Sequence, residues 1–232
     1  MVKSLTLKQK TTGYRYNRDS FLLADFFRPR GAASLIDLGA GVGVVSILIG
    51  RTNPNMIITA VEINKELAAQ AMSNARQTGL TRYHTVVANV MDTPNMLGEG
   101  RFDCAVSNPP YHEVGSGRIC ADPARAAARH ELTMTLEGLV KTSARLLREG
   151  GRLFVTMIHE RRAQYERILA GNGFFETRHR QVLPLPDGKP ILFLSEVALG
   201  VKLPKTVEPP LALRSTGGGD SDEYKLVASR QS

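Results

Sequence analysis

A short apolar run that leads into three alternating glycines constrains the fold of this 232-residue chain more than any other feature. Residues 34–38 are typical of a buried parallel strand, and Gly39, Gly41 and Gly43 follow before the helix-like run 44–51. Glycines at such a turn permit positive φ angles and let a ligand approach the backbone. The helix start beyond them offers unpaired N–H groups to acceptor atoms. The segment therefore predicts a strand-turn-helix unit of an open α/β sheet, with a ligand at the turn.

The glycine turn differs from the dinucleotide-binding fingerprint, because Val44 stands where that pattern requires a third glycine. An acid nevertheless follows at the expected distance: Glu62 closes the next strand-like run, about twenty residues beyond the turn. At that place a carboxylate can accept from both hydroxyls of a ribose. The alternative interpretation of Glu62 is a surface acid without a ligand.

Strand-like and helix-like segments alternate along the chain, which predicts a mostly parallel sheet with helices on both faces. The expected strands span residues 34–38, 56–61, 83–88, 102–107, 152–157, 174–182 and 191–200, the last two as an antiparallel pair. The expected helices span residues 44–51, 64–79, 132–148 and 160–170. Open α/β sheets bind ligands at the carboxyl ends of their strands, where the glycine turn falls.

A second motif, Asn108-Pro109-Pro110-Tyr111, follows the strand-like run 102–107. Neither proline can donate to a ladder, and each pushes the preceding residue out of the helical region, so the backbone leaves the sheet extended. The Asn side chain and nearby carbonyl oxygens then surround one point with acceptors, beside an aromatic ring. This arrangement suits a planar amino group, such as N6 of adenine or a glutamine amide. A proline-rich turn beside a core tyrosine is the alternative.

These motifs together resemble the class I S-adenosylmethionine-dependent methyltransferases that modify exocyclic amino or amide nitrogens. Within that class the chain is most similar to the bacterial tRNA (adenine-N6)-methyltransferases, which modify the adenine 3′ of the anticodon in a valine tRNA. The likeness rests on residues 13–24, on the glycine turn with the Asn-Pro-Pro-Tyr motif, and on residues 124–131, and it extends to about residue 200. The resemblance implies a Rossmann-like, seven-stranded α/β sheet, mostly parallel with an antiparallel last strand, and S-adenosyl-L-methionine as cofactor.

The expected chemistry needs no dedicated base. The Asn108 side-chain oxygen and the Pro109 carbonyl would bind both hydrogens of the adenine amino group, which favours a pyramidal nitrogen whose lone pair points at the methyl group. Tyr111 would stack on the base, and the base must be unpaired or flipped to reach the pocket. The candidate catalytic residues are Asn108, Pro109, Pro110 and Tyr111.

Further candidates follow from the same resemblance. Asp37 would orient the glycine turn and the cofactor amino group, with a turn-capping role as the alternative, and Asn89 replaces an Asp that the family usually has at the cofactor adenine. Asp19 would close over the cofactor or cap the fold. The candidate cofactor-binding residues are Asp37, Gly39, Gly41, Gly43, Glu62, Asn89 and Asp19. The candidate RNA-binding residues are Arg15, Arg125, Arg129 and His130, for which ordinary surface charges are the alternative.

The charge favours a polyanionic partner, because the formal net charge is +8 and the sequence pI is about 9.7. Residues 1–30 hold seven basic and two acidic residues, a net +5, which is typical of phosphate contact. Neither of the two cysteines has metal-site spacing, so no metal is expected. No apolar stretch reaches the length of a membrane span, and we expect a cytoplasmic protein.

Three parts are expected: a basic N-terminal extension, 1–30, with a short helix near 18–27; a methyltransferase core, 31–203; and a partly mobile tail, 204–232. Within the tail a hairpin of 211–213 with 224–227 is possible. The expected function is methyl transfer to adenine N6 in RNA, most simply tRNA. The alternatives are a glutamine-N5 methyltransferase of peptide release factors, whose family carries a helical domain before the core, and a non-catalytic nucleic-acid-binding protein. The sequence leaves the oligomeric state open.

Overall fold

An eight-stranded mixed sheet forms the centre of the molecule, in the order β3-β2-β1-β4-β5-β7-β6-β8. The structure is a computed structural model, and it describes residues 18–109 and 134–231. The strands are β1 Ser34–Leu38, β2 Ile57–Glu62, β3 Tyr83–Val87, β4 Phe102–Ser107, β5 Leu147–Ile158, β6 Phe174–Leu183, β7 Leu192–Leu199 and β8 Thr206–Ala212. β1 to β5 pair in parallel, and β7 runs antiparallel to β5 and β6. The predicted α/β fold and the antiparallel last pair are confirmed, with one strand more than the seven expected.

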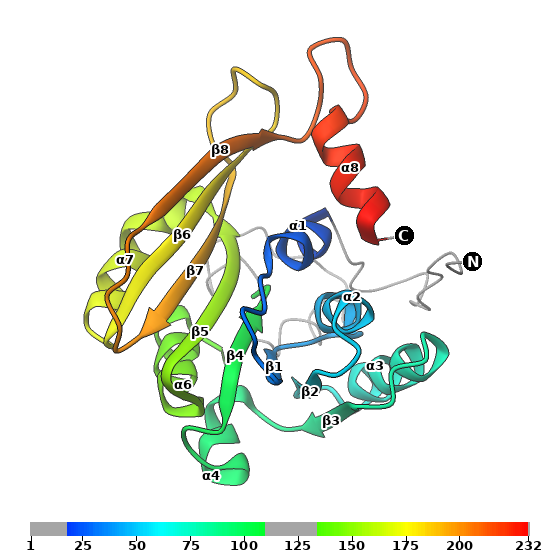
Figure 1. Cartoon of the computed structure of the whole chain (residues 1–232), viewed down its shortest axis with the longest axis vertical. Coiled ribbons are helices and arrows are strands. Elements are labelled where there is room, and N and C mark those ends of the chain that lie inside the picture. The colour runs from blue at the N-terminus through cyan, green and yellow to red at the C-terminus, as the bar shows by residue number, and fades with distance from the viewer. Residues whose placement is uncertain (1–17, 110–133, 232) are drawn as a thin grey trace, which may run out of the picture.

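Helices cover both faces of this sheet (Figure 1). They are α1 Arg18–Phe26, α2 Val44–Thr52, α3 Lys65–Gln77, α4 Thr93–Leu97, α6 Leu136–Leu146, α7 Arg162–Ala170 and α8 Asp222–Gln231, with short 3-10 turns at Val90–Asp92 and His159–Arg161. One buried cluster lies under α1, α2 and α3, and a second lies under α6 and α7. The sheet is therefore apolar on both faces, as its near-continuous apolar strands predict.

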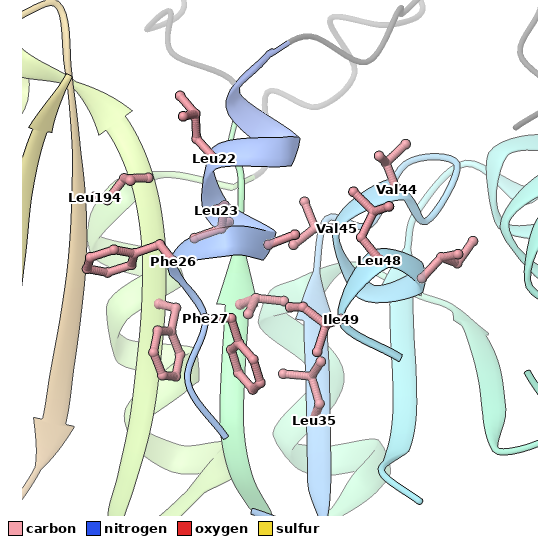
Figure 2. Packing of buried hydrophobic residues seen from close by; sticks show 14 of the residues in the cluster. Leu22, Leu23, Phe26, Phe27, Leu35, Val44, Val45, Leu48, Ile49 and Leu194 are labelled. Carbon is pink, nitrogen blue, oxygen red and sulfur yellow. The ribbon is translucent and has the colours of Figure 1, made fainter. Parts of the chain in front are cut away.

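Helix α1 belongs to the core, although it lies within the stretch expected to be an N-terminal extension. Its apolar residues recur at helical spacing and are almost fully buried: Leu22, Leu23 and Phe26, with Phe27 just beyond. Figure 2 shows these side chains between Leu194 of the sheet and the residues of α2. The rings of Phe27 and Phe154 lie 4.7 Å apart between centroids. The short helix predicted near residues 18–27 is confirmed.

The C-terminal segment differs most from its prediction. Residues 224–227 lie in α8 rather than in a hairpin, and residues 206–212 form β8, which pairs in parallel with β6. β8 contains Pro209 and Pro210, and prolines are tolerated there because an edge strand has one unpaired side. The hairpin expectation was therefore wrong.

The junction between α6 and β5 also differs. The helix was expected to continue to residue 148, but it ends at Leu146 and β5 starts at the next residue. The ladder with β4 then passes from Leu147 directly to Arg152, so the intervening residues, including Gly150 at φ 73°, form an irregularity in the strand.

A buried carboxylate connects the second half of the sheet. Glu196 of β7 is fully buried and accepts from Arg152 of β5 at 2.5 Å and from Arg178 of β6 at 2.8 Å. Arg178 also reaches Glu208 of β8 at 2.8 Å, donates to the carbonyl of Phe26, and lies 3.8 Å from the centroid of the Phe26 ring. These contacts join β5, β6, β7, β8 and the end of α1.

We expect Glu196→Gln to destabilise the protein by about 3–5 kcal/mol, because it leaves the charge of Arg178, which is 5% exposed, without its principal buried partner. Urea unfolding of the variant and wild type measures this difference. The matched control is Glu137→Gln, which breaks an exposed pair with Lys141 and should leave the unfolding midpoint unchanged. Equal losses in both variants would contradict the assignment.

Candidate active site at the carboxyl edge of the sheet

Three neighbouring strands bring the main sequence motifs together. β1 lies between β2 and β4, with Leu38 opposite Val61 and Asp37 opposite Val106. The strands run in parallel, so the glycine turn after β1 lies at the same edge as Glu62 and as Asn108. Ser107 strengthens this arrangement by donating its hydroxyl to the Leu38 carbonyl at 2.7 Å.

The glycine turn requires its glycines for two different reasons. Gly39, Gly41 and Gly43 have φ angles of 78°, 57° and 82°, which L side chains rarely adopt. A Cβ at Gly43 would also lie 2.5 Å from the Tyr83 hydroxyl, so this position has no room for a side chain. Among the residues that the structure describes, no atom lies within 4 Å of a Cβ placed at Gly41. The backbone at Gly41 is thus open to a ligand, whereas Gly43 serves packing.

Glu62 holds the turn in this conformation. Its side chain is buried, one carboxylate oxygen accepts from the Gly41 N–H at 2.8 Å, and the other accepts from the Asn64 N–H at 2.8 Å. Each carboxylate oxygen can accept more than one hydrogen bond, so these contacts leave acceptor capacity for hydroxyl groups. The alternative of a surface acid is excluded by the burial.

Asp37 lies beneath the turn and lacks a full set of partners. It is buried, and Ser46 at the start of α2 donates to it through its backbone and its side chain. Its Oδ2 atom is buried and has no hydrogen-bond partner among the described residues. Burial raises the pKa of Asp37 to about 6, and the negative charge of Glu62 adds to the shift. A buried carboxylate with an unpartnered oxygen fits a site that receives a positively charged ligand or a hydrogen-bond donor.

Asn108 follows β4, and its side chain is half-buried. Its Nδ2 donates to the Ser20 hydroxyl of α1 at 3.2 Å, and Pro109 beyond it is buried. Asp19, next to Ser20, is buried in the first turn of α1, so α1 contributes two polar residues to this edge. Asn89 caps the 3-10 turn at Val90–Asp92, where its Oδ1 accepts from the Met91 N–H at 3.0 Å.

Sequence reasoning missed several residues that shape the turn. Asn74 of α3 is fully buried and donates to the Val42 carbonyl at 3.0 Å, and the Tyr83 hydroxyl lies 3.0 Å from that of Ser46. The signal for Asn74 was its place in the apolar stripe of α3, between Ala71 and Ala75, where a polar side chain needs a partner. Nothing local marked Ser46 or Tyr83.

The remaining candidates lie outside the described residues. These are Pro110, Tyr111, Arg15, Arg125, Arg129 and His130. Within residues 18–109 and 134–231, no group of three or more His, Cys, Asp or Glu side chains could hold a metal ion. None of the helices in this part of the chain has the length and apolar character needed to cross a membrane.

Residues 15–180 match the family model of the methyltransferase small domain, and the chain belongs to this family. Among curated relatives, two are each named tRNA1(Val) (adenine(37)-N6)-methyltransferase and align over nearly the whole chain. The protein of Tolumonas auensis is 28% identical over 97% of this chain and 93% of the relative, and that of Parabacteroides distasonis is 26% identical over 97% and 94%. A protein of the same name from Escherichia coli is 33% identical over 68% of this chain and 60% of the relative.

Solved structures agree on the fold. A predicted O-methyltransferase from Agrobacterium tumefaciens superposes with a TM-score of 0.69 at 19% identity, over 92% of this chain and 97% of that chain. A putative RNA methyltransferase from Pyrococcus horikoshii gives 0.52 at 18% identity, over 78% and 84%. At these identities the likeness supports the class I methyltransferase fold and no finer assignment.

Because of Asp37, the stability of the ligand-free protein should decrease as the pH rises. Because its pKa in the folded protein, about 6, lies above the ordinary 3.8, its ionisation costs stability, and this cost grows as the pH rises from about 4 to above 6. The difference in unfolding free energy between Asp37→Asn and wild type should therefore shift by about 2 kcal/mol in favour of the variant as the pH rises from 4.5 to 7.5. Urea unfolding at both pH values measures this gain, and parallel pH curves for the two proteins would contradict it.

Proposed function

We propose that this protein is an S-adenosyl-L-methionine-dependent methyltransferase that transfers a methyl group to the exocyclic N6 of an adenine in tRNA. The observation that carries the proposal is the adjacency of the open glycine turn after β1 and of Asn108 after β4 on one edge of the sheet. The names of the aligned relatives support the same acceptor. A tRNA substrate would place the protein in the cytoplasm.

The residues around the turn fit this cofactor. Gly41 presents open backbone, Glu62 has acceptor capacity for the ribose hydroxyls, and the unpartnered Asp37 oxygen provides negative charge near a cationic ligand. Asn89 would border the adenine of the cofactor, as the family resemblance implies. Its Oδ1 accepts from the Met91 N–H and keeps a second lone pair for the adenine amino group, and its Nδ2 can donate toward a ring nitrogen. When bound, the cofactor would supply a methyl carbon on a sulfonium centre.

The acceptor side depends on the end of β4. The Asn108 side-chain oxygen and the Pro109 carbonyl would accept the two hydrogens of the adenine amino group, which directs the nitrogen lone pair out of the ring plane. These two acceptors would hold the amino nitrogen while it takes up the methyl group that the cofactor supplies, and the proton that the nitrogen then loses would pass to water. Neither residue has to act as a base, so the contribution of the protein is orientation and charge stabilisation.

Substrate access follows from the charge. A chain of net charge +8 is attracted to phosphate, and an adenine in a loop is already free of the stack, so it can enter without the full cost of flipping. We propose that Arg15, Arg125, Arg129 and His130 contribute phosphate contacts, and that Tyr111 stacks on the target base, as the family resemblance implies.

Asn108→Ala should abolish methyl transfer while the dissociation constant for S-adenosylmethionine stays within about threefold of wild type, because the side chain acts on the acceptor. Labelled methyl transfer to total tRNA, ribosomal RNA and a peptide release factor, followed by nucleoside analysis, measures activity and identifies the acceptor. Asn55→Ala, an exposed position before β2 at the opposite edge, is the control and should remain fully active. An active Asn108→Ala enzyme, or transfer only to the release factor, would refute the proposal.

Gly41→Ala should weaken cofactor binding at least about tenfold, because the new methyl group would enter the open space at the turn. Its φ angle is positive, so the substitution also costs about 1 kcal/mol of stability. Gly31→Ala is a matched control: its φ is 83° and no atom of the described part of the chain lies within 4 Å of a Cβ placed there, but it lies before β1, away from the turn. Calorimetric titration with S-adenosylmethionine separates the two, and equal affinities would remove Gly41 from the cofactor site.

A further inference from the structure

The side chain of Asn108 is held by a residue of α1. Its Nδ2 donates to the Ser20 hydroxyl at 3.2 Å, across 88 positions of sequence, and Ser20 is only 4% exposed. Strand alternation agrees with this contact, because Cys104 and Val106 of β4 face the buried cluster under α1 and Asn108 continues that series. The contact therefore joins the end of β4 to the first turn of α1.

Helix α1 is itself fixed on two sides. Its apolar face is packed against α2 and the sheet, as Figure 2 shows. Its outer side meets α8, which lies beside it in Figure 1. Arg18 bonds Asp220 at 2.7 Å and lies 5.0 Å from the centroid of the Tyr224 ring, and Asp25 pairs with Arg230 at 3.2 Å. A residue in the first turn of α1 thus has a well-defined position relative to the sheet.

The position of Ser20 matters because an amide is asymmetric. Rotation of the Asn108 amide by half a turn would exchange Oδ1 and Nδ2 and present a donor to an amino group that needs an acceptor. Since both atoms are bonded to one carbon, a partner that accepts from Nδ2 also sets the direction of Oδ1. A hydroxyl can accept from Nδ2 or donate to Oδ1. In this structure the Ser20 hydroxyl accepts from Nδ2, and this contact directs Oδ1 away from Ser20, the orientation in which the oxygen can receive the substrate.

We propose that Ser20 is a positioning residue for methyl transfer, which holds the Asn108 amide with its oxygen directed to the acceptor amino group. This inference rests on the proposed function and adds a residue of α1 to it. Correct orientation affects the transition state more than ground-state binding, so the effect belongs in kcat.

Ser20→Ala should lower kcat about tenfold, with KM for tRNA and the dissociation constant for S-adenosylmethionine within about twofold of wild type. Ser20→Thr keeps the hydroxyl and should recover most of the lost rate. The matched control is Ser143→Ala, which removes an equally buried helical hydroxyl from α6 on the other face of the sheet and should leave kcat unchanged. Steady-state kinetics measures kcat and KM. Titration with S-adenosylmethionine gives the dissociation constant and the fraction of the protein that binds cofactor, by which kcat is corrected.

Several results would overturn the inference. Wild-type kcat in Ser20→Ala does so, and so does a lower kcat that merely follows a smaller fraction of cofactor-binding protein, since that is a folding defect. A further comparison uses Asn108→Asp, which presents an oxygen in either orientation. In that background Ser20→Ala should cost less than in the Asn108 enzyme, and an equal cost contradicts selection between orientations. If Asn108→Asp is inactive, the kcat values of Ser20→Ala and Ser20→Thr in the Asn108 enzyme test the inference.

The failure of this inference is distinguishable from that of the proposed function. A wild-type protein that transfers no methyl group to tRNA refutes the function itself. An active wild type, inactivated by Asn108→Ala but insensitive to Ser20→Ala, refutes only the role of Ser20.

Discussion

The parallel pairing of β1 with both β2 and β4 is the constraint on which the site depends. Parallel strands end at the same edge, so their registers place the glycine turn, Glu62 and Asn108 at the ends of three neighbouring strands. The bond from Ser107 to the Leu38 carbonyl holds the last residues of two of these strands together. A slip of one residue in β4 would turn Asn108 to the opposite face, because strand side chains alternate.

The net charge of the chain and the charge buried at the glycine turn have opposite signs. The chain as a whole is basic, whereas Asp37 and Glu62 place two buried carboxyl groups under and beside the glycine turn. Burial raises the pKa of Asp37 to about 6, so the ionisation of this carboxyl costs stability. A cationic ligand would relieve that cost, and phosphate is drawn to the basic exterior. This charge distribution suits the cationic cofactor and the anionic substrate of the proposed function.

The sequence predicted what depends on local pattern. The apolar runs of β1 to β4, the helices α1 and α3 and the antiparallel last pair all have period, capping or turn signals within a few residues. β8 has none, since two prolines argue against a strand and only an edge position accommodates them. The contacts of Ser20 with Asn108 and of Asn74 with Val42 span 88 and 32 positions, and no local pattern reports such pairs.

The elements that escaped prediction are connected to those that carry the chemistry. β8 completes the edge of the sheet, α8 packs on both β8 and α1, and α1 in turn contacts Asn108 through Ser20. Arg178 of β6 connects β8 to α1 as well, through its bonds to Glu208 and to the carbonyl of Phe26, and it also bonds Glu196 of β7. The C-terminal segment therefore has a physical route to the reacting edge that needs no contact with a substrate: it fixes the helix that orients the amide.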